Sequence, residues 1–171
     1  MNPMQQVKIG KVTLNIGAGK DPAKLEKGLV LIKAITKIEP IKTVTMKRIA
    51  EWGLRPGLPI GCKLTLRKKP AQELLTRLLK AKENNLAERN FDTNGNISFG
   101  IQEYIDIPGV AYDPKIGVIG LEVCVTLEKN GYRIKNRKIK QKKLPKKHTV
   151  TKEEAKEFMK KQFKTGIVAE A

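Results

Sequence analysis

The sequence has few of the residues on which metal sites, disulfide frameworks and membrane spans depend. It holds two cysteines, Cys62 and Cys124, and one histidine, His148, in 171 residues. No cluster of His, Cys, Asp and Glu has metal-ligand spacing, so we expect no metal and no other cofactor. The two cysteines lack framework spacing, which favours small buried hydrophobic residues in a reducing compartment. No run of about 18 apolar residues occurs, which argues against a membrane-spanning helix.

Enzyme chemistry and a secretion signal are also hard to find. His148 sits among lysines, which make it a poor proton acceptor. The first ten residues lack the basic-then-apolar pattern of a signal peptide, so we expect a cytoplasmic protein. The segment GAGKD, residues 17–21, suggests a phosphate loop and hence a nucleotide-hydrolysing enzyme. A Walker loop needs Ser or Thr after its Lys, whereas Asp21 follows Lys20 here, which favours a tight turn into a helix instead.

Negative charge is scarce relative to positive charge. The chain has 35 Lys and Arg against 17 Asp and Glu, a formal net charge of +18. This excess predicts a polyanionic partner, either nucleic acid or an anionic membrane surface. Within residues 129–152 there are eleven Lys and Arg and no Asp or Glu. Such a run repels itself and has little to bury, so we expect it to order on phosphates, with a solvated tail as the alternative.

Alternating apolar and polar residues predict four main strands. They cover residues 7–16, 42–47, 63–67 and 118–128. Asn94-Gly95 predicts a hairpin turn between short strands, one around Phe91 and one over Ile97–Gly100. The stretch 103–108 is a further extended candidate.

Apolar residues at helical spacing predict three helices. Asp21 followed by Pro22 opens the first, Pro70 the second, and a Thr151–Glu154 capping box the third. The residues expected to face the core are Leu25, Leu29, Ile32, Ile35, Leu74, Leu75, Leu78, Leu79, Ala155, Phe158, Met159 and Phe163. Strands that do not strictly alternate with helices favour an α+β fold, with a mainly antiparallel sheet, helices packed on one face and an open polar and basic face.

The chain divides by composition into an α+β RNA-binding core, residues 1–132, and a basic extension with a C-terminal helix, residues 133–171, packed on the same domain. The open face of the sheet carries hydrogen-bonding groups that suit phosphates and ribose hydroxyls. They are Lys11, Thr13, Asn15, Thr43, Thr45, Lys47, Lys63, Thr65 and Arg67. The strands show no exposed aromatic residue, which favours a folded RNA recognised by shape over stacked single strands; plain soluble β-surface is the alternative.

A long loop, residues 48–61, joins the second and third strands and holds three Gly, two Pro and the only Trp. Loops of this kind, held at both ends by strands, often contact a partner. The residues expected to reach outward are Arg48, Trp52, Arg55, Pro56 and Gly57. Packing of Trp52 within the loop is the alternative. The cations expected to bind RNA in the basic extension are Arg133, Lys135, Arg137, Lys138, Lys140, Lys142, Lys143, Lys146 and Lys147.

Four segments resemble, in order, the "L-five" family of large-subunit ribosomal proteins that bind 5S ribosomal RNA. They are VTLNIGAG (Val12–Gly19), RPGLPIGCKLTLR (Arg55–Arg67), GNISFGIQEY (Gly95–Tyr104) and IPGVAYDPKIGVIGLEV (Ile107–Val123). The segment Lys147–Phe163 is similar to the archaeal and eukaryotic branch, and archaeal members in particular. The chain lacks the long N-terminal helix of bacterial members. It also lacks their PRIRDFRG-like stretch and has a short polar segment, residues 83–90, in its place.

The resemblance implies a structural, non-enzymatic component of the large ribosomal subunit. It implies 5S rRNA as partner, attached in the central protuberance, together with large-subunit rRNA, neighbouring ribosomal proteins and a small-subunit bridge partner, and no membrane. It also implies that the 48–60 loop reaches towards P-site tRNA. Asn15 and Thr65 match family positions at the 5S surface, and the other face residues extend that set by strand geometry. An RNA chaperone acting outside the ribosome remains an alternative.

Overall fold

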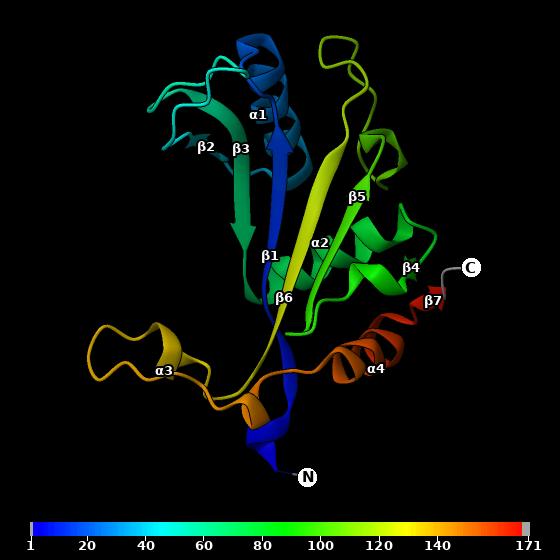
Figure 1. Cartoon of the computed structure of the whole chain (residues 1–171). Helices are drawn as coiled ribbons and strands as arrows, with labels where there is room; N and C mark the ends of the chain where they lie inside the picture. The colour runs from blue at the N-terminus through cyan, green and yellow to red at the C-terminus, as the bar shows by residue number, and fades with distance from the viewer. Residues whose placement is uncertain (1, 169–171) are drawn as a thin grey trace. The chain divides into compact units, whose positions relative to one another are not determined.

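The computed structural model describes residues 2–168 (Figure 1). Its elements are η1 (Pro3–Gln5), β1 (Val7–Gly17), α1 (Pro22–Thr36), β2 (Ile41–Val44), β3 (Pro59–Leu66), α2 (Lys68–Lys80), β4 (Asn85–Ala87), η2 (Glu88–Asn90), β5 (Asn96–Ile101), η3 (Tyr104–Asp106), β6 (Leu121–Lys129), α3 (Arg133–Asn136), η4 (Lys146–His148), α4 (Lys152–Phe163) and β7 (Gly166–Val168). Among these described residues, none of the helices has the length and apolar character needed to cross a membrane.

Five strands form one mainly antiparallel sheet in the order β2-β3-β1-β6-β5, which confirms the α+β class. β2 runs antiparallel to β3, with Ile41 opposite Lys63 and Thr43 opposite Gly61, and the register shifts between Thr43 and Val44. A separate parallel pair, β4 with β7, was not predicted. Each of these strands has three residues, which is too short for alternation of apolar and polar residues to predict a strand.

The chain forms two compact units, each with its own core. The first comprises residues 2–12, 67–99 and 124–168, and the second residues 13–66 and 100–123. The division falls within the ranges of β1, β5 and β6. The described part of the basic extension, residues 133–168, belongs to the first unit.

The second unit is built on α1 and the strands that it covers. Leu25, Ile32 and Ile35 are buried as predicted, but Leu29 is half-exposed and Leu31 is fully buried instead. Gly28 also faces inward, because a Cβ there would lie 3.1 Å from Cys62 Sγ and 3.3 Å from Ile16 Cγ2. The helix thus approaches β1 and β3 through a glycine, which rotates the buried stripe relative to the predicted one.

In the first unit, the apolar sides of α2 and α4 are buried. All four predicted leucines of α2 are buried, and so are Ala155 and Met159 of α4. Phe158 and Phe163 are half-exposed and pack edge-to-face with ring centroids 6.4 Å apart. α2 begins at Lys68, two residues before the predicted Pro70.

Both predicted helix caps are confirmed. The Asp21 carboxylate accepts a 2.9 Å hydrogen bond from the Ala23 N–H, with Pro22 at the first helical position. Thr151 and Glu154 exchange both bonds of a capping box, at 3.3 and 3.0 Å. The Asn94-Gly95 turn is also present, with Gly95 at φ +73° and Phe91 bridged to Ile97.

Three local expectations are wrong. Residues 104–106 form a 3-10 turn rather than extended chain, because this turn buries the Tyr104 ring, whose hydroxyl accepts from the Asp113 N–H at 3.0 Å. β2 ends at Val44 rather than at residue 47, where the register shift interrupts the ladder. Cys124 is exposed rather than buried, whereas Cys62 is fully buried and burial raises its pKa to about 11.

Candidate nucleic-acid interface

Polar side chains of three neighbouring strands form what we call the polar face: Thr13, Asn15, Lys63, Thr65 and Glu122 of the second unit. They alternate along their strands with buried apolar residues, as the sequence pattern requires. Thr13 of β1 and Thr65 of β3 bring their hydroxyl oxygens to 3.3 Å. The structure therefore brings together both residues of the predicted 5S-facing pair, since Asn15 lies two positions along β1 from Thr13.

Asn15 is held in one orientation by Glu122. Its side-chain Nδ2 donates to Oε2 of Glu122 at 2.9 Å, across from β1 to β6. An ionised carboxylate only accepts hydrogen bonds, so the amide must turn its nitrogen towards Glu122 and its oxygen away. The face therefore presents an amide acceptor as well as hydroxyl groups. Donors on an RNA, such as a ribose 2′-hydroxyl, are the complementary groups.

The outward side of β6 was not included in the predicted interface. Glu122 and Cys124 are exposed, and Thr126 and Glu128 are half-exposed, in alternation with buried Val123, Val125 and Leu127. The alternation of residues 118–128 already separated these side chains from the apolar set. The alternation alone does not predict that β6 lies beside β1, because this depends on the order of the strands in the sheet.

The predicted contribution of β2 differs from the structure. Thr43 stays on the outward side, opposite Gly61, and is half-exposed. Thr45 is buried and its hydroxyl donates to the Lys47 carbonyl at 3.0 Å, so it does not reach the polar face. Val44 and Met46 are exposed in its place, 51% and 86%. The register shift after Thr43 is the physical reason, because it turns the following residues over.

Two other predicted face residues belong to the first unit. Lys11 is half-exposed on β1. Arg67 is exposed just before α2, and its guanidinium donates to the Gly10 carbonyl at 3.4 Å. Lys47 is exposed beyond the end of β2.

The loop between β2 and β3 has internal structure. Ile49 and Leu54 exchange backbone hydrogen bonds of 3.1 and 2.9 Å around Gly53, whose φ is +66°. Leu54 is buried. Arg48, Arg55, Pro56 and Gly57 are exposed. Trp52 is 65% exposed, which contradicts the alternative prediction that its ring packs within the loop.

The GAGKD turn does not offer a phosphate cradle. The N–H groups of Ala18 and Gly19 both donate to the Ile60 carbonyl, at 2.9 and 3.0 Å. A phosphate loop depends on backbone N–H groups that point at the ligand. Here those donors tie the turn to β3, and Asp21 caps α1.

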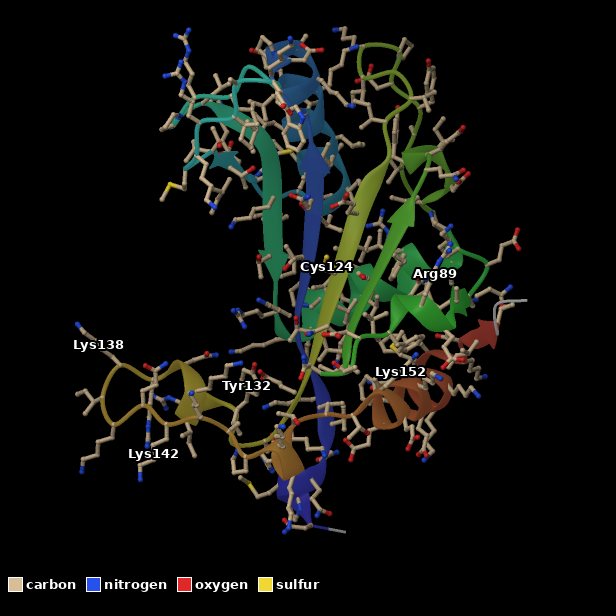
Figure 2. All side chains as sticks on the ribbon, viewed as in Figure 1. Arg89, Cys124, Tyr132, Lys138, Lys142 and Lys152 are labelled. Atoms are coloured by element: carbon tan, nitrogen blue, oxygen red, sulfur yellow. The ribbon has the colours of Figure 1, made fainter. Side chains whose placement is uncertain are left out.

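Residues 133–147, which we call the basic loop, contain all nine cations predicted in the extension. Figure 2 labels Lys138 and Lys142 on it. Its ends are pinned together, since a ring nitrogen of His148 lies 2.7 Å from the Asn130 carbonyl oxygen. Within the loop, the Lys142 N–H donates to the Ile134 carbonyl at 3.3 Å, and Arg137 Nε donates to the Lys140 carbonyl at 2.8 Å. The loop therefore has local hydrogen bonds of its own, and its ordering on phosphates stays a prediction.

An ion pair between a buried lysine and a half-exposed glutamate joins the segments on either side of the basic loop. Lys129 is 6% exposed, and its ammonium donates to Glu154 at 2.8 Å and to the Thr149 carbonyl at 3.4 Å. Burial acts to raise the pKa of the Glu154 carboxyl, but the hydrogen bonds from Lys129 and from the Thr151 N–H outweigh it and hold that pKa below its usual value. One of the eleven cations of the run thus serves packing and not an external anion.

Comparison with known proteins decides the family. The model of ribosomal protein L5 matches residues 2–55, and the model of the C-terminus of the same ribosomal family matches residues 59–158. The chain belongs to the ribosomal protein L5 family. The L5 chain is therefore a structural ribosomal protein and not an enzyme, and the resemblance noted in its sequence is confirmed.

Similar L5 proteins come from archaea, in agreement with the branch indicated by the C-terminal segment. The protein of Sulfurisphaera tokodaii is 44% identical over 98% of this chain and 96% of its own length. That of Methanobrevibacter smithii is 44% identical over 99% of this chain and 100% of its own. The protein of Methanosphaera stadtmanae is 45% identical over 98% and 99%. Each is named large ribosomal subunit protein uL5.

Proposed function

We propose that this L5-family chain is a structural component of the large ribosomal subunit that binds 5S rRNA through its polar face and helps to attach it in the central protuberance. The observation that carries the proposal is the arrangement of Thr13, Thr65 and Asn15. Thr65 is exposed, and Thr13 and Asn15 are half-exposed. Their polar groups are neutral and already oriented by one another and by Glu122. Orientation before binding lowers the entropy that an interface must lose.

The chemistry of the polar face suits a folded RNA. Hydroxyl groups donate to phosphate oxygens or accept from 2′-hydroxyls, and the Asn15 oxygen accepts. Lys63 is exposed on β3 and adds one positive charge. No aromatic ring lies among the polar-face residues, so base stacking does not contribute there. Shape and backbone recognition remain as the source of specificity.

The test replaces both family-matched residues together, as Asn15→Ala plus Thr65→Ala, and measures 5S rRNA binding by filter titration. Two hydrogen-bonding side chains, each contributing about 0.5–1.5 kcal/mol, predict a loss of roughly 5- to 150-fold. Thr76→Ala, an exposed threonine of α2, is the matched control. Wild-type affinity of a folded double variant would overturn the assignment of 5S binding to this face. Sucrose-gradient sedimentation with large subunits separates this role from that of an RNA chaperone.

A second contact is favoured by the loop between β2 and β3, which we propose reaches P-site tRNA. Trp52 is 65% exposed and Arg48 and Arg55 are exposed around a hairpin with its own backbone bonds. A cation pair with an exposed ring suits a nucleic acid. Photo-cross-linking from position 52 in intact ribosomes should label tRNA only when the P site is filled. No labelled tRNA with a filled P site, or equal labelling when tRNA occupies the A site alone, would contradict this contact.

The basic loop is proposed to bind large-subunit rRNA by charge. Its nine cations have no carboxylate within residues 133–147 to neutralise them. Phosphate contacts of this kind add affinity that does not depend on sequence. Bridging to the small subunit and packing against neighbouring ribosomal proteins belong to the same proposal for the assembled particle.

A further inference from the structure

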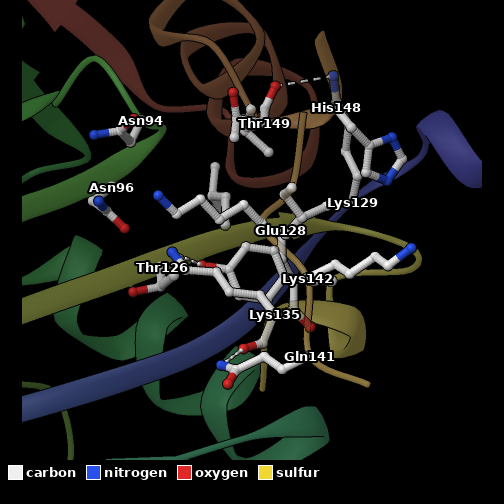
Figure 3. A pocket seen from close by; sticks show the side chains of 15 residues that line it. Asn94, Asn96, Thr126, Glu128, Lys129, Lys135, Gln141, Lys142, His148 and Thr149 are labelled. Atoms are coloured by element: carbon white, nitrogen blue, oxygen red, sulfur yellow. Dashed lines mark hydrogen bonds between the residues drawn. The ribbon is translucent and has the colours of Figure 1, made fainter. Parts of the chain in front are cut away.

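A cavity of about 740 Å³ opens between the basic loop and β6 in the first unit (Figure 3). Its walls come from the turn before β5, the end of β6, α3 and the returning arm of the loop. Small-molecule sites typically have volumes of about 300–1,000 Å³. The cavity is therefore large enough for a single nucleotide.

The charge at the cavity favours an anion. Lys135, Lys142 and Lys143 line it, and Glu128 is the carboxylate that lines it with them. Lys8 lies 3.9 Å from Glu128 and offsets its charge, while Lys129 is already paired with Glu154. Lysine ammonium groups are common ligands of phosphate. A phosphate group is thus the expected anionic part of an occupant.

An aromatic side chain, Tyr132, also lines the cavity. It is the only Phe, Tyr or Trp in the sequence of residues 129–152. Lys135 covers part of this ring, with its Nζ 5.4 Å from the ring centroid and 3.3 Å from the hydroxyl oxygen. Aromatic rings next to cations are the usual platform for an unpaired base. The polar face has no such ring. Tyr132 therefore offers the first unit a stacking platform, in addition to the exposed Trp52 ring of the second unit.

Side-chain amides of the cavity supply acceptors for a base edge. Asn96 donates its Nδ2 to Asp92 at 3.1 Å, and Gln141 donates its Nε2 to the Lys135 carbonyl. Since both nitrogens are engaged, each amide turns its oxygen away from its partner. Exocyclic amines of adenine, cytosine and guanine are the complementary donors.

We propose that this cavity binds one unpaired RNA nucleotide, with its base on Tyr132 and its phosphate at Lys142 and Lys143. The proposal rests on the RNA-binding role proposed for the basic loop and specifies it: the loop holds a nucleotide flipped out of a helix, in addition to duplex backbone. The loop is suited to this because its hydrogen bonds to Ile134 and Lys135 fix the returning arm beside β6.

The test uses the full chain labelled with 3-fluorotyrosine and followed by fluorine NMR. The chain has three tyrosines: Tyr104 is buried, Tyr112 is 54% exposed and Tyr132 lines the cavity. Titration with a single-stranded adenosine hexanucleotide should shift the Tyr132 signal to saturation and leave the Tyr112 signal in place. A saturated complex with an unmoved Tyr132 signal would overturn the proposal. Adenosine monophosphate and a 12-base-pair RNA duplex, titrated in parallel, separate a free nucleotide or duplex backbone from an unpaired RNA residue.

Variants separate stacking from charge. Tyr132→Ala should weaken hexanucleotide binding about tenfold, with Tyr132→Phe close to wild type. Lys142→Gln with Lys143→Gln should weaken it more than the matched pair Lys138→Gln with Lys140→Gln, which lies on the same loop outside the cavity. Equal effects of the two lysine pairs, with no effect of Tyr132→Ala, would show electrostatic attraction alone and contradict the proposal.

The result is independent of the 5S assignment. Asn15 and Thr65 do not line the cavity, so their double variant should keep the hexanucleotide-dependent shift of Tyr132 even where 5S binding is lost. A chain that binds 5S rRNA normally but shows no Tyr132 shift would overturn the nucleotide site alone.

Discussion

The polar face and the basic loop are both proposed to bind RNA, but by different means. On the polar face, neutral groups are fixed by one another: Thr13 against Thr65 and Asn15 against Glu122. On the basic loop, backbone hydrogen bonds fix the chain while the lysine ends extend into solvent. Oriented neutral groups discriminate between RNA shapes, whereas mobile charges attract any phosphate backbone. We therefore expect the first region to supply specificity and the second to supply affinity.

The largest effect is expected from removing charge on the basic loop. Replacing Lys138, Lys140, Lys142 and Lys143 by Gln removes four cations at near-constant shape. Each neutralised phosphate contributes roughly 0.7–0.9 to the slope of log K against log salt concentration, so the slope should flatten by about 3. Filter binding to large-subunit rRNA fragments between low and physiological salt measures it. An unchanged slope would mean that these lysines do not contact that RNA.

The next largest effect is expected on protein stability, from the ion pair between Lys129 and Glu154. Glu154→Gln leaves Lys129 buried without a charged partner and should cost about 1–3 kcal/mol in unfolding free energy, less than a fully buried pair because the Glu154 side chain is 42% exposed. Urea unfolding at pH 7 measures it. Glu153→Gln, one residue away on an exposed position, is the matched control and should change little.

The same ion pair makes a pH prediction. The folded-state pKa of Glu154 lies below its ordinary value of 4.5, so the pair stabilises the fold fully above that value. Its contribution disappears as pH falls through the lowered pKa. The difference in stability between wild type and Glu154→Gln should therefore be present at neutral pH and vanish in acid. A difference that persists at pH values below the lowered pKa would rule out the ion pair as its source.

A smaller effect with an informative sign is expected at Glu122. Glu122→Gln removes a negative charge, which by charge alone should strengthen RNA binding. If the carboxylate fixes the Asn15 amide, 5S affinity should instead fall roughly two- to fivefold. Glu128→Gln, on the same side of β6, controls for charge. In an Asn15→Ala background Glu122→Gln should no longer weaken binding, and continued weakening there would contradict the positioning role.

The smallest effect on 5S binding is expected from the loop between β2 and β3. Trp52→Ala removes a ring that is 65% exposed and is not one of the polar-face residues, so 5S affinity should stay within about twofold of wild type. With the photo-probe at position 55 in both chains, the same variant should cross-link less P-site tRNA in ribosomes than the chain that keeps Trp52. Filter titration and cross-linking on one preparation compare the two. A strong loss of 5S binding would assign Trp52 to the same interface as Thr65.

Much of the fold was readable because local signals are strong where an element must separate core from solvent. The alternation of β1, the Asp21 cap and the Thr151–Glu154 capping box all appear as predicted. The burial of Thr45 was not readable, because it follows from a register shift against β3. A one-residue shift reverses inside and outside, and alternation alone does not locate it.

For the same reason, only part of the candidate site could be predicted from the sequence. Thr13, Asn15 and Thr65 follow from the period of their own strands. The pairing of Asn15 with Glu122 joins residues 107 positions apart and depends on the strand order, which places β6 beside β1. The cavity at Tyr132 likewise depends on how the basic loop returns, and net charge predicts the loop's ligand but not its shape.

The most direct test of the division between specificity and affinity is a salt series for two variants. The ratio of 5S rRNA affinity to that for an unrelated RNA of equal length is measured for Asn15→Ala with Thr65→Ala, and for the four-lysine variant. We predict that the polar-face variant lowers the ratio at an unchanged salt slope, while the loop variant flattens the slope at a nearly unchanged ratio. A loop variant that lowers the ratio, with a polar-face variant that changes only the slope, would contradict this division.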